Sequence, residues 1–356
     1  MAQQHTLDTA ADLETDAPHK GPLRLIGELL VLAIAILASL MAIILMIPDK
    51  NDYSKATLLK NDRLAAIEGR KVVLVGGSNL AYGMESDVIQ DATGCPTVNM
   101  GMNGYFGVRY MLNEVKPRLR DGDIVVLAFE WDNYAKTVDG AGKDLFAVSR
   151  TNPSAISRLT PKQMAMAASN LPYVAQTKLF RVIDDTLRGI MPSGGDRVVG
   201  STVLDQIEVL DGFDEQGDLN SHEGVVWELA YEPGADLAAH GLEEPLIDLI
   251  KGFSADMAAR DITVVVSYTP TMRSYYEEQK AVIDEAHRQL TSGEDAVNAP
   301  RAPEAFVFDA DYFFDTVYHL KTTTRAERSQ MVADDIQTVL GSTPDCRATA
   351  QQGESS

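Results

Sequence analysis

One apolar segment limits the fold of this chain more than any other feature. Leu29–Ile47 runs for about 19 residues without a charged side chain, and a helix of that length crosses the hydrocarbon core of a bilayer. The segment is apolar on every face and follows a polar leader, which argues against a helix buried in a protein core. A cleaved signal peptide would have a shorter apolar region before a small-x-small site, whereas this run ends at Pro48-Asp49-Lys50. The sequence therefore predicts one uncleaved transmembrane anchor at residues 25–48.

Basic residues flank this anchor unevenly. Two precede it and four follow it: Lys20, Arg24, Lys50, Lys55, Lys60 and Arg63. Basic side chains favour the cytoplasmic side of a membrane, so the count alone places the following domain inside the cell. Long domains, however, cross a membrane largely regardless of nearby charge. The flanking charges therefore leave the side of the domain open.

Acidity and cysteine content exclude several classes of function. The net charge of -21 makes the surface repel nucleic-acid phosphates, and we expect no nucleic-acid partner. Cys95 and Cys346 are far apart and form no CxxC pair, which excludes a disulfide scaffold and a zinc ribbon. One disulfide between them could form in an oxidising compartment, although Cys346 lies in a polar tail.

Short apolar runs alternate with helical patterns after the anchor. Five runs are typical of buried strands: 71–76, 97–100, 123–129, 262–268 and 306–308. Helical patterns at 244–260 and 275–290 separate the later ones. Continuous apolar strands separated by helices predict a parallel sheet covered on both faces. We therefore expect a doubly wound, flavodoxin-like α/β domain with a parallel sheet of about five strands, preceded by one transmembrane helix.

Polar segments and one large insertion complete the expected organisation. The boundaries are 1–24 for a disordered cytoplasmic leader, 49–70 for a helical stalk, 71–340 for the α/β domain, 135–243 for its insertion and 341–356 for a disordered tail. Within the insertion, helices are expected near 161–170 and 177–188. The insertion either covers the carboxyl ends of the strands as a lid or docking element, or only packs on the core.

The first strand ends in a glycine-rich turn that presents a serine. Ser78 follows Gly76 and Gly77, where ligands bind in open α/β sheets. A Rossmann fingerprint does not fit, because the next glycine is Gly83, and a Walker loop would need a lysine after its last glycine. The serine is therefore either a nucleophile at the sheet edge or an ordinary helix cap.

The last strand is followed by an acid and a histidine that suit such a serine. Asp315 and His319 stand at i and i+4, so a helix would place them on one face. A carboxylate there can fix the imidazole while its other nitrogen faces a serine. A purely structural pair is the alternative. A metal site is disfavoured, because a calcium loop would need a glycine and a closing glutamate that this segment lacks.

These residues together resemble the SGNH, or GDSL-like, hydrolases, over about 71–134 and 262–340. The resemblance implies that Ser78 is the nucleophile, that Asp315 and His319 complete the triad, and that Gly104 donates its backbone N–H to an oxyanion. Gly77 stands where the family has Asp, and the Asp–His spacing is four rather than three. No organic cofactor is implied.

The third family block departs further from this pattern. The sequence Glu130-Trp131-Asp132-Asn133 lacks the usual glycine, and its asparagine is shifted by one position. The resemblance implies that Asn133 supplies the second oxyanion donor, unless that donor is lost. We expect the chain to leave the strand by Trp131, so that the Asn133 amide turns inward to within about 6 Å of the Ser78 hydroxyl. Glu130 or Asp132 facing Ser78 instead would weaken the catalytic interpretation.

The anchor and the insertion are similar to one subset of this family. Its members are membrane-tethered SGNH-like proteins that act with membrane-bound O-acyltransferases on extracellular polysaccharides or teichoic acids. The resemblance implies a single-pass protein of the inner membrane with its domain in the periplasm or outside the cell. It also implies a serine acyl-ester hydrolase or O-acyltransferase, most simply for O-acetyl groups, acting on a cell-envelope glycan. The alternatives are a catalytically degenerate binding or assembly subunit and, less well supported, a nucleotide-dependent α/β enzyme.

Overall fold

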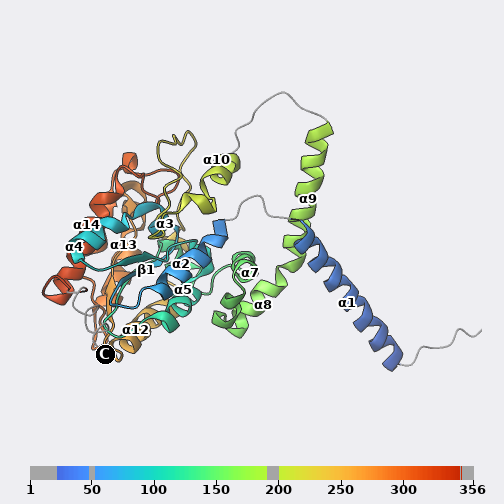
Figure 1. Cartoon of the computed structure of the whole chain (residues 1–356), viewed down its shortest axis with the longest axis horizontal. Helices are drawn as coiled ribbons and strands as arrows, with labels where there is room; N and C mark the ends of the chain where they lie inside the picture. The colour runs from blue at the N-terminus through green and yellow to red at the C-terminus, as the bar shows by residue number, and fades with distance from the viewer. Residues whose placement is uncertain (1–21, 48–52, 191–199, 345, 347–356) are drawn as a thin grey trace, which may run out of the picture.

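The computed structural model describes residues 22–47, 53–190, 200–344 and 346. The leader predicted at 1–24 and the tail predicted at 341–356 lie mostly outside these residues. The described chain is an α/β protein with a parallel sheet of four strands, preceded by one apolar helix (Figure 1).

The apolar segment forms helix α1 (Pro22–Met46), which extends away from the sheet domain (Figure 1). Its 25 residues span about 37 Å at 1.5 Å per residue, more than the hydrocarbon core of a bilayer. Its side chains are mostly exposed, and Ile44 is its buried residue. The prediction of an N-terminal helix long and apolar enough to cross a membrane is therefore confirmed. The helix begins at Pro22 rather than at residue 25.

Four parallel strands form the sheet in the order β2-β1-β3-β4. Their bounds are Val72–Gly76 for β1, Thr97–Asn99 for β2, Ile124–Ala128 for β3 and Thr263–Val266 for β4. The central strand β1 pairs Val73 with Val98 on one side and with Val125 on the other. All four strands lie within runs predicted from the sequence.

Helices cover both faces of this sheet. Alternate residues of β1 enter different core clusters, Val73 and Val75 on one face and Val72 and Leu74 on the other. The face of Leu74 packs against α3 (Ser78–Gly83), α4 (Ser86–Thr93) and α14 (Arg325–Leu340). The core on the face of Val73 includes side chains of α2 (Ala56–Ala66), α5 (Val108–Val115), α12 (Pro245–Ala258) and α13 (Arg273–Thr291).

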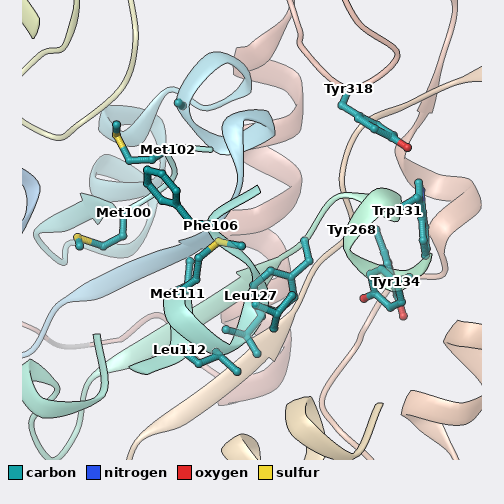
Figure 2. Close-up of a cluster of buried hydrophobic side chains, with 14 of the residues drawn as sticks. Met100, Met102, Phe106, Met111, Leu112, Leu127, Trp131, Tyr134, Tyr268 and Tyr318 are labelled. Carbon is teal, nitrogen blue, oxygen red and sulfur yellow. The ribbon is translucent and has the colours of Figure 1, made fainter. Parts of the chain in front are cut away.

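The larger core cluster reaches the carboxyl end of the sheet, as Figure 2 shows. Its labelled side chains are Met100, Met102, Phe106, Met111, Leu112, Leu127, Trp131, Tyr134, Tyr268 and Tyr318. The Trp131 and Tyr268 rings stack with centroids 5.7 Å apart, and the Trp131 indole N–H donates to Thr271 Oγ1 at 2.9 Å. This packing fixes the start of α6 (Trp131–Ala135), the short helix that follows β3.

The predicted fifth strand does not join this sheet. Residues 307–308 instead form β6 (Val307–Phe308), which pairs in parallel with β5 (Thr271–Met272) as a separate two-stranded ladder. Asn298 occupies the free edge of β4: its carbonyl accepts the Val266 N–H at 2.7 Å, and its Nδ2 donates to the Val264 carbonyl at 3.0 Å. The edge that a fifth strand would need is therefore already hydrogen-bonded.

The segment predicted as a stalk at 49–70 is instead part of the domain. Helix α2 packs Leu64 into the main core and buries Lys60 almost completely. The Lys60 ammonium donates to the carbonyls of Gly101 and Gly217, the latter at 2.7 Å. Burial lowers the pKa of Lys60 to about 7. The described part of this segment therefore lies against the sheet domain and is not a separate stalk.

The insertion between β3 and β4 is largely helical. Its described helices are α7 (Gly142–Thr151), α8 (Pro161–Ser169), α9 (Leu171–Ile190), α10 (Gly200–Ile207) and α11 (Leu237–His240). The helices predicted near 161–170 and 177–188 correspond to α8 and α9. Helix α9 lies beside the carboxyl end of α1, away from the sheet (Figure 1).

Candidate active site

Two glycines place Ser78 at the carboxyl end of β1. A Cβ on Gly76 would overlap the Ala128 carbonyl oxygen of the neighbouring strand. A Cβ on Gly77 would lie 2.6 Å from Glu130 Oε1 and 2.9 Å from Gly104 Cα. Close approach therefore requires glycine at both positions, and α3 begins at Ser78 immediately afterwards. This is the sheet edge at which the sequence predicts the serine.

Glu130 is the polar side chain that contacts Ser78. The Ser78 hydroxyl donates to Glu130 Oε1 at 2.9 Å, and the Asn79 N–H donates to the same oxygen at 2.8 Å. Glu130 lies two residues after the end of β3 and is the N-cap of α6. Its carboxylate therefore joins the turn after β1 to the turn after β3. The sequence shows Glu130 only as a departure from the family pattern, without indicating this contact.

The Asn133 side chain points inward, but its amide is hydrogen-bonded to other parts of the protein. The chain leaves the strand by Trp131, as expected, and Asn133 is fully buried. Its Nδ2 donates to the Gly104 carbonyl at 2.9 Å and to Thr137 Oγ1 at 2.7 Å. Its Oδ1 accepts the Glu130 N–H at 3.2 Å. Both amide hydrogens are thus engaged, which differs from the expectation that they would bind an oxyanion.

Gly104 lies against the same carboxylate. It begins the 3-10 turn η2 (Gly104–Phe106), and a Cβ at this position would overlap Glu130 Oε2. The Glu130 carboxylate therefore fills the space between the Ser78 turn and Gly104, where the family resemblance implies an oxyanion. An anionic carboxylate there repels a developing negative charge.

Asp315 and His319 meet as predicted, but without a helix. Asp315 Oδ1 lies 2.7 Å from His319 Nδ1. The segment between them is a loop, closed by the Phe314 N–H, which donates to the His319 carbonyl at 2.8 Å, and by the His319 N–H, which donates to Thr316 Oγ1 at 3.1 Å. The spacing of four residues therefore works through a tight loop rather than through a helical turn.

The surroundings of His319 favour its protonated form. The imidazole is buried and stacks on the Tyr82 ring with centroids 4.1 Å apart. Burial is the strongest influence and acts to lower the pKa of His319, but the surrounding carboxylates, Asp315 first among them, together more than offset it, and the pKa is raised. Glu130 and Glu208 act in the same direction as Asp315. With Nδ1 held by Asp315, Nε2 is the nitrogen left for proton transfer.

Ser78 and His319 line one small pocket of about 90 Å³. Its walls also include Tyr105, Glu130, Asp132, Glu232, Thr316 and Tyr318. Three of these side chains are acidic, so the pocket has a negative potential that disfavours anionic ligands. Its size suits a small group better than a long chain. The role of Glu232 in the wall could not be found from sequence, because it comes from the insertion.

A buried arginine supports the serine turn from α14. Arg328 is completely buried, and its guanidinium donates to the Asn79 carbonyl at 2.7 Å and to Asn79 Oδ1 at 2.8 Å. Burial lowers the pKa of Arg328 to about 9, while Glu130 raises it. Arg328 thus connects α14 to α3 through Asn79 and supplies positive charge near the Glu130 carboxylate.

No protein-family model matches this chain, and no curated protein matches it. The likeness to SGNH proteins therefore depends on the motifs and on the geometry of Ser78, Asp315 and His319. Among the described residues, no group of three or more His, Cys, Asp or Glu side chains is arranged to hold a metal ion.

Proposed function

We propose that this chain is a membrane-tethered serine acyl-ester hydrolase or O-acyltransferase of the SGNH type, in a doubly wound, flavodoxin-like domain. One observation carries the proposal: Ser78, at the carboxyl end of β1, shares a small pocket with His319, whose Nδ1 lies 2.7 Å from Asp315. The nucleophile comes from the turn after β1, whereas the base and its orienting acid come together from one loop far along the chain. That convergence is the arrangement that acyl transfer through serine requires.

The chemistry follows from these positions. Nε2 of His319 takes the Ser78 proton as Oγ attacks the acyl carbonyl, and the resulting imidazolium is stabilised by Asp315. The protonated imidazole then gives its proton to the leaving alcohol, which leaves an acyl group on Ser78. Water, or a sugar hydroxyl, then takes the acyl group by the reverse sequence. In the first step Ser78 must exchange its hydrogen bond to Glu130 for one to His319.

The pocket supports a small acyl group on an uncharged part of a glycan. Its volume of about 90 Å³ suits an acetyl group, and its acidic walls disfavour carboxylated or phosphorylated sugars. A membrane-bound O-acyltransferase is the partner proposed to supply the acyl group. The glycan is proposed to be an extracytoplasmic polysaccharide or another cell-envelope polymer.

A disulfide supports placing the domain outside the cytoplasm. Cys95 and Cys346 are bonded, with their Cα atoms 5.0 Å apart. Disulfides persist in the periplasm and outside the cell and are rare in the cytosol. We therefore propose a single-pass inner-membrane protein with a periplasmic or extracellular domain, against the count of basic residues that follow α1. Activity of a C-terminal reporter that functions only in the cytoplasm would contradict this orientation.

Fluorophosphonate labelling tests the proposed nucleophile directly. The purified full-length protein should be modified at one site, and peptide mass spectrometry should locate the adduct on Ser78. Ser292→Ala, which alters an exposed serine far along the chain, should label like the parent protein, whereas Ser78→Ala should not label. Equal labelling of Ser78→Ala would show that the reactive serine lies elsewhere.

A second candidate function is favoured by Glu130. Its carboxylate fills the space beside Gly104, and the Asn133 amide is engaged within the fold. Losing one oxyanion donor typically reduces a rate by about 100- to 1000-fold. A catalytically degenerate subunit that binds glycan in the acidic pocket is therefore the alternative. It predicts glycan binding that Ser78→Ala leaves unchanged, together with no fluorophosphonate labelling of the parent protein.

Replacing Glu130 by glutamine should increase hydrolysis of 4-nitrophenyl acetate. Glutamine keeps the oxygen that accepts from Ser78 and Asn79, while it removes a negative charge from the space for the oxyanion. We expect a rise in kcat of about tenfold, because the side chain no longer repels the negative charge that develops on the oxyanion. Glu232→Gln removes a second carboxylate from the same pocket and should change kcat little. A loss of activity in Glu130→Gln would instead make Glu130 the base.

Activity should rise with pH as His319 loses its proton, because only neutral imidazole can accept the Ser78 proton. The raised pKa of His319 places the midpoint above the ordinary histidine value. Glu208 raises that pKa, and it accepts a hydrogen bond from Tyr82 at 3.2 Å. We expect the kcat/KM profile of Glu208→Gln to shift to lower pH with an unchanged plateau. An unshifted profile would exclude this electrostatic coupling.

A further inference from the structure

The imidazole of His319 lies flat on the ring of Tyr82. The two ring centroids are 4.1 Å apart, and the ring planes are inclined by only 2°. Both side chains are buried. The bond to Asp315 fixes one edge of the imidazole, and the stack fixes its plane, because a tilted ring would lose the contact. The two contacts together determine where Nε2, the nitrogen left for proton transfer, can lie.

Tyr82 comes from the same short helix as the serine. Ser78 and Tyr82 stand at i and i+4 on α3, so their side chains lie on one side of this helix. His319 belongs to the segment that follows β6, outside the main sheet. The stack is therefore a direct contact between the helix that carries the nucleophile and the loop that carries the base. It joins these two segments where the sheet does not.

The Tyr82 ring is itself held by the insertion. Its hydroxyl donates to Glu208 Oε1 at 3.2 Å, and the centroid of the His222 ring lies 5.0 Å from its own. Phe314 stacks on it with centroids 6.3 Å apart. Burial, the strongest influence, raises the pKa of Tyr82 well above its ordinary value. The phenol therefore stays neutral when His319 gains a proton, and it forms a fixed, uncharged aromatic surface against the base.

The protonated form of His319 is stabilised by such a surface. A cation within about 6 Å of an aromatic centroid is attracted to the face of the ring, and the attraction is stronger where water is excluded. His222 does not compete for the proton, because burial lowers its pKa to about 4. Carboxylates around His319 come from its own loop, from the residues after β3 and from the insertion: Asp315, Glu130, Asp132, Glu208 and Glu232. Tyr82 adds an aromatic contact to these charges.

We propose that Tyr82 is a positioning residue for the base: its ring sets the plane of the His319 imidazole and stabilises the imidazolium formed during acyl transfer. As the bond between Ser78 Oγ and the acyl carbon forms, the hydroxyl proton moves to Nε2, and the imidazole gains one positive charge. That charge disappears when the proton passes to the leaving alcohol. The ring therefore favours the charged state between the two proton transfers. The inference rests on the serine chemistry proposed above.

Fluorinated rings at position 82 test the stabilisation with little change in ring size. Tyr82 is replaced by phenylalanine and by its mono-, tri- and pentafluorinated forms in the full-length Ser78→Ala protein, and His319 is titrated by NMR with labelled histidine. Each fluorine withdraws electrons from the ring face, so the midpoint of the His319 titration should move to lower pH along the series. The same series at Phe306, a buried ring that packs on Tyr268, should leave the midpoint unchanged. A constant midpoint along the series at position 82 would overturn the proposal.

Aliphatic and aromatic replacements test the effect on catalysis. Tyr82→Leu should reduce kcat for 4-nitrophenyl acetate about tenfold, the effect of losing one cation–π contact in a desolvated site. It should leave KM nearly unchanged and shift the kcat/KM profile to lower pH. Tyr82→Phe keeps the ring and should retain kcat to within about twofold. Tyr276→Leu, which removes a buried tyrosine ring from α13, is the matched control for lost packing and should keep both the rate and the profile.

Two kinetic results would contradict the inference. Equal losses in Tyr82→Leu and Tyr82→Phe would overturn it, because the hydroxyl bond to Glu208 would then matter rather than the ring. An unshifted pH profile in Tyr82→Leu would also overturn it. The NMR titration needs no turnover, so its result is separate from the proposed function. A protein that hydrolyses no ester, but in which His319 follows the fluorine series, would refute the serine chemistry and support the stabilisation by Tyr82.

Discussion

Ser78→Ala and His319→Ala should each reduce hydrolysis of 4-nitrophenyl acetate at least about 1000-fold, because members of a triad act as one unit. The double variant should be scarcely slower than either single variant, because the first change already removes the function of the second residue. The rates are measured as initial velocities on the purified full-length protein. The same variants are then compared for glycan acylation in cells.

Two controls separate this effect from unfolding. Ser292→Ala and His240→Ala alter an exposed serine and an exposed histidine and should retain the parent rate. The thermal midpoint of Ser78→Ala should stay close to that of the parent, because its hydroxyl forms one hydrogen bond to Glu130. Full acylation in cells by Ser78→Ala would exclude the proposed nucleophile and favour the binding subunit.

Removing the disulfide should lower the free energy of unfolding by about 2–5 kcal/mol. Cys95 and Cys346 are separated by 251 positions, and closing a loop of that size strongly restricts the unfolded chain. Both sulfurs also lie in the core cluster that contains Val332 and Ile336 of α14. The measurement is urea unfolding of the double variant Cys95→Ser/Cys346→Ser, compared with the parent protein.

Reduction of the parent protein provides the control for this experiment. Dithiothreitol should lower the parent to the stability of the double serine variant and should leave that variant unchanged. Equal unfolding midpoints for the oxidised parent and the double variant would contradict the prediction. Protein alkylated directly in cells should carry no label on Cys95 or Cys346. Two labelled cysteines would place the domain in a reducing compartment and reverse the proposed orientation.

The sheet was predictable because each of its strands is buried on both faces. A run such as residues 124–127 has no polar position, and its short length and β-branched residues favour a strand covered on both sides. The prediction that a fifth strand at 306–308 joins the sheet was wrong, because Asn298, which lies outside any named strand, bonds the edge of β4 through its carbonyl and its side chain. The prediction of a stalk was wrong because the polar sequence of α2 suggests an exposed helix. Lys60 is nevertheless buried, because its ammonium donates to the carbonyls of Gly101 and Gly217, which lie far along the chain.

The candidate site was predictable only where its residues follow strands. Ser78 follows β1 of the main sheet, where ligands are expected, whereas the strand β6 that precedes His319 lies in a separate ladder, so the sheet alone does not explain why the two residues share a pocket. Arg328 could not be found, because nothing on α14 indicates that a helix far along the chain binds the Asn79 carbonyl. The contact between Glu130 and Ser78 depends on the orientation of a single side chain, and the residue pattern does not encode it.

The packing of α2 has a consequence for how the domain meets its substrate. Only residues 48–52 separate the end of the α1 region from Tyr53, which is already buried, and five residues span at most about 18 Å. With α1 spanning a membrane, as proposed, the domain would be held next to the bilayer, and its effective concentration toward anything at that surface would be high. Molecules that diffuse freely gain nothing from this confinement. Under the proposed function, a polymer still held at the membrane surface would therefore meet the pocket more often than one released into solution.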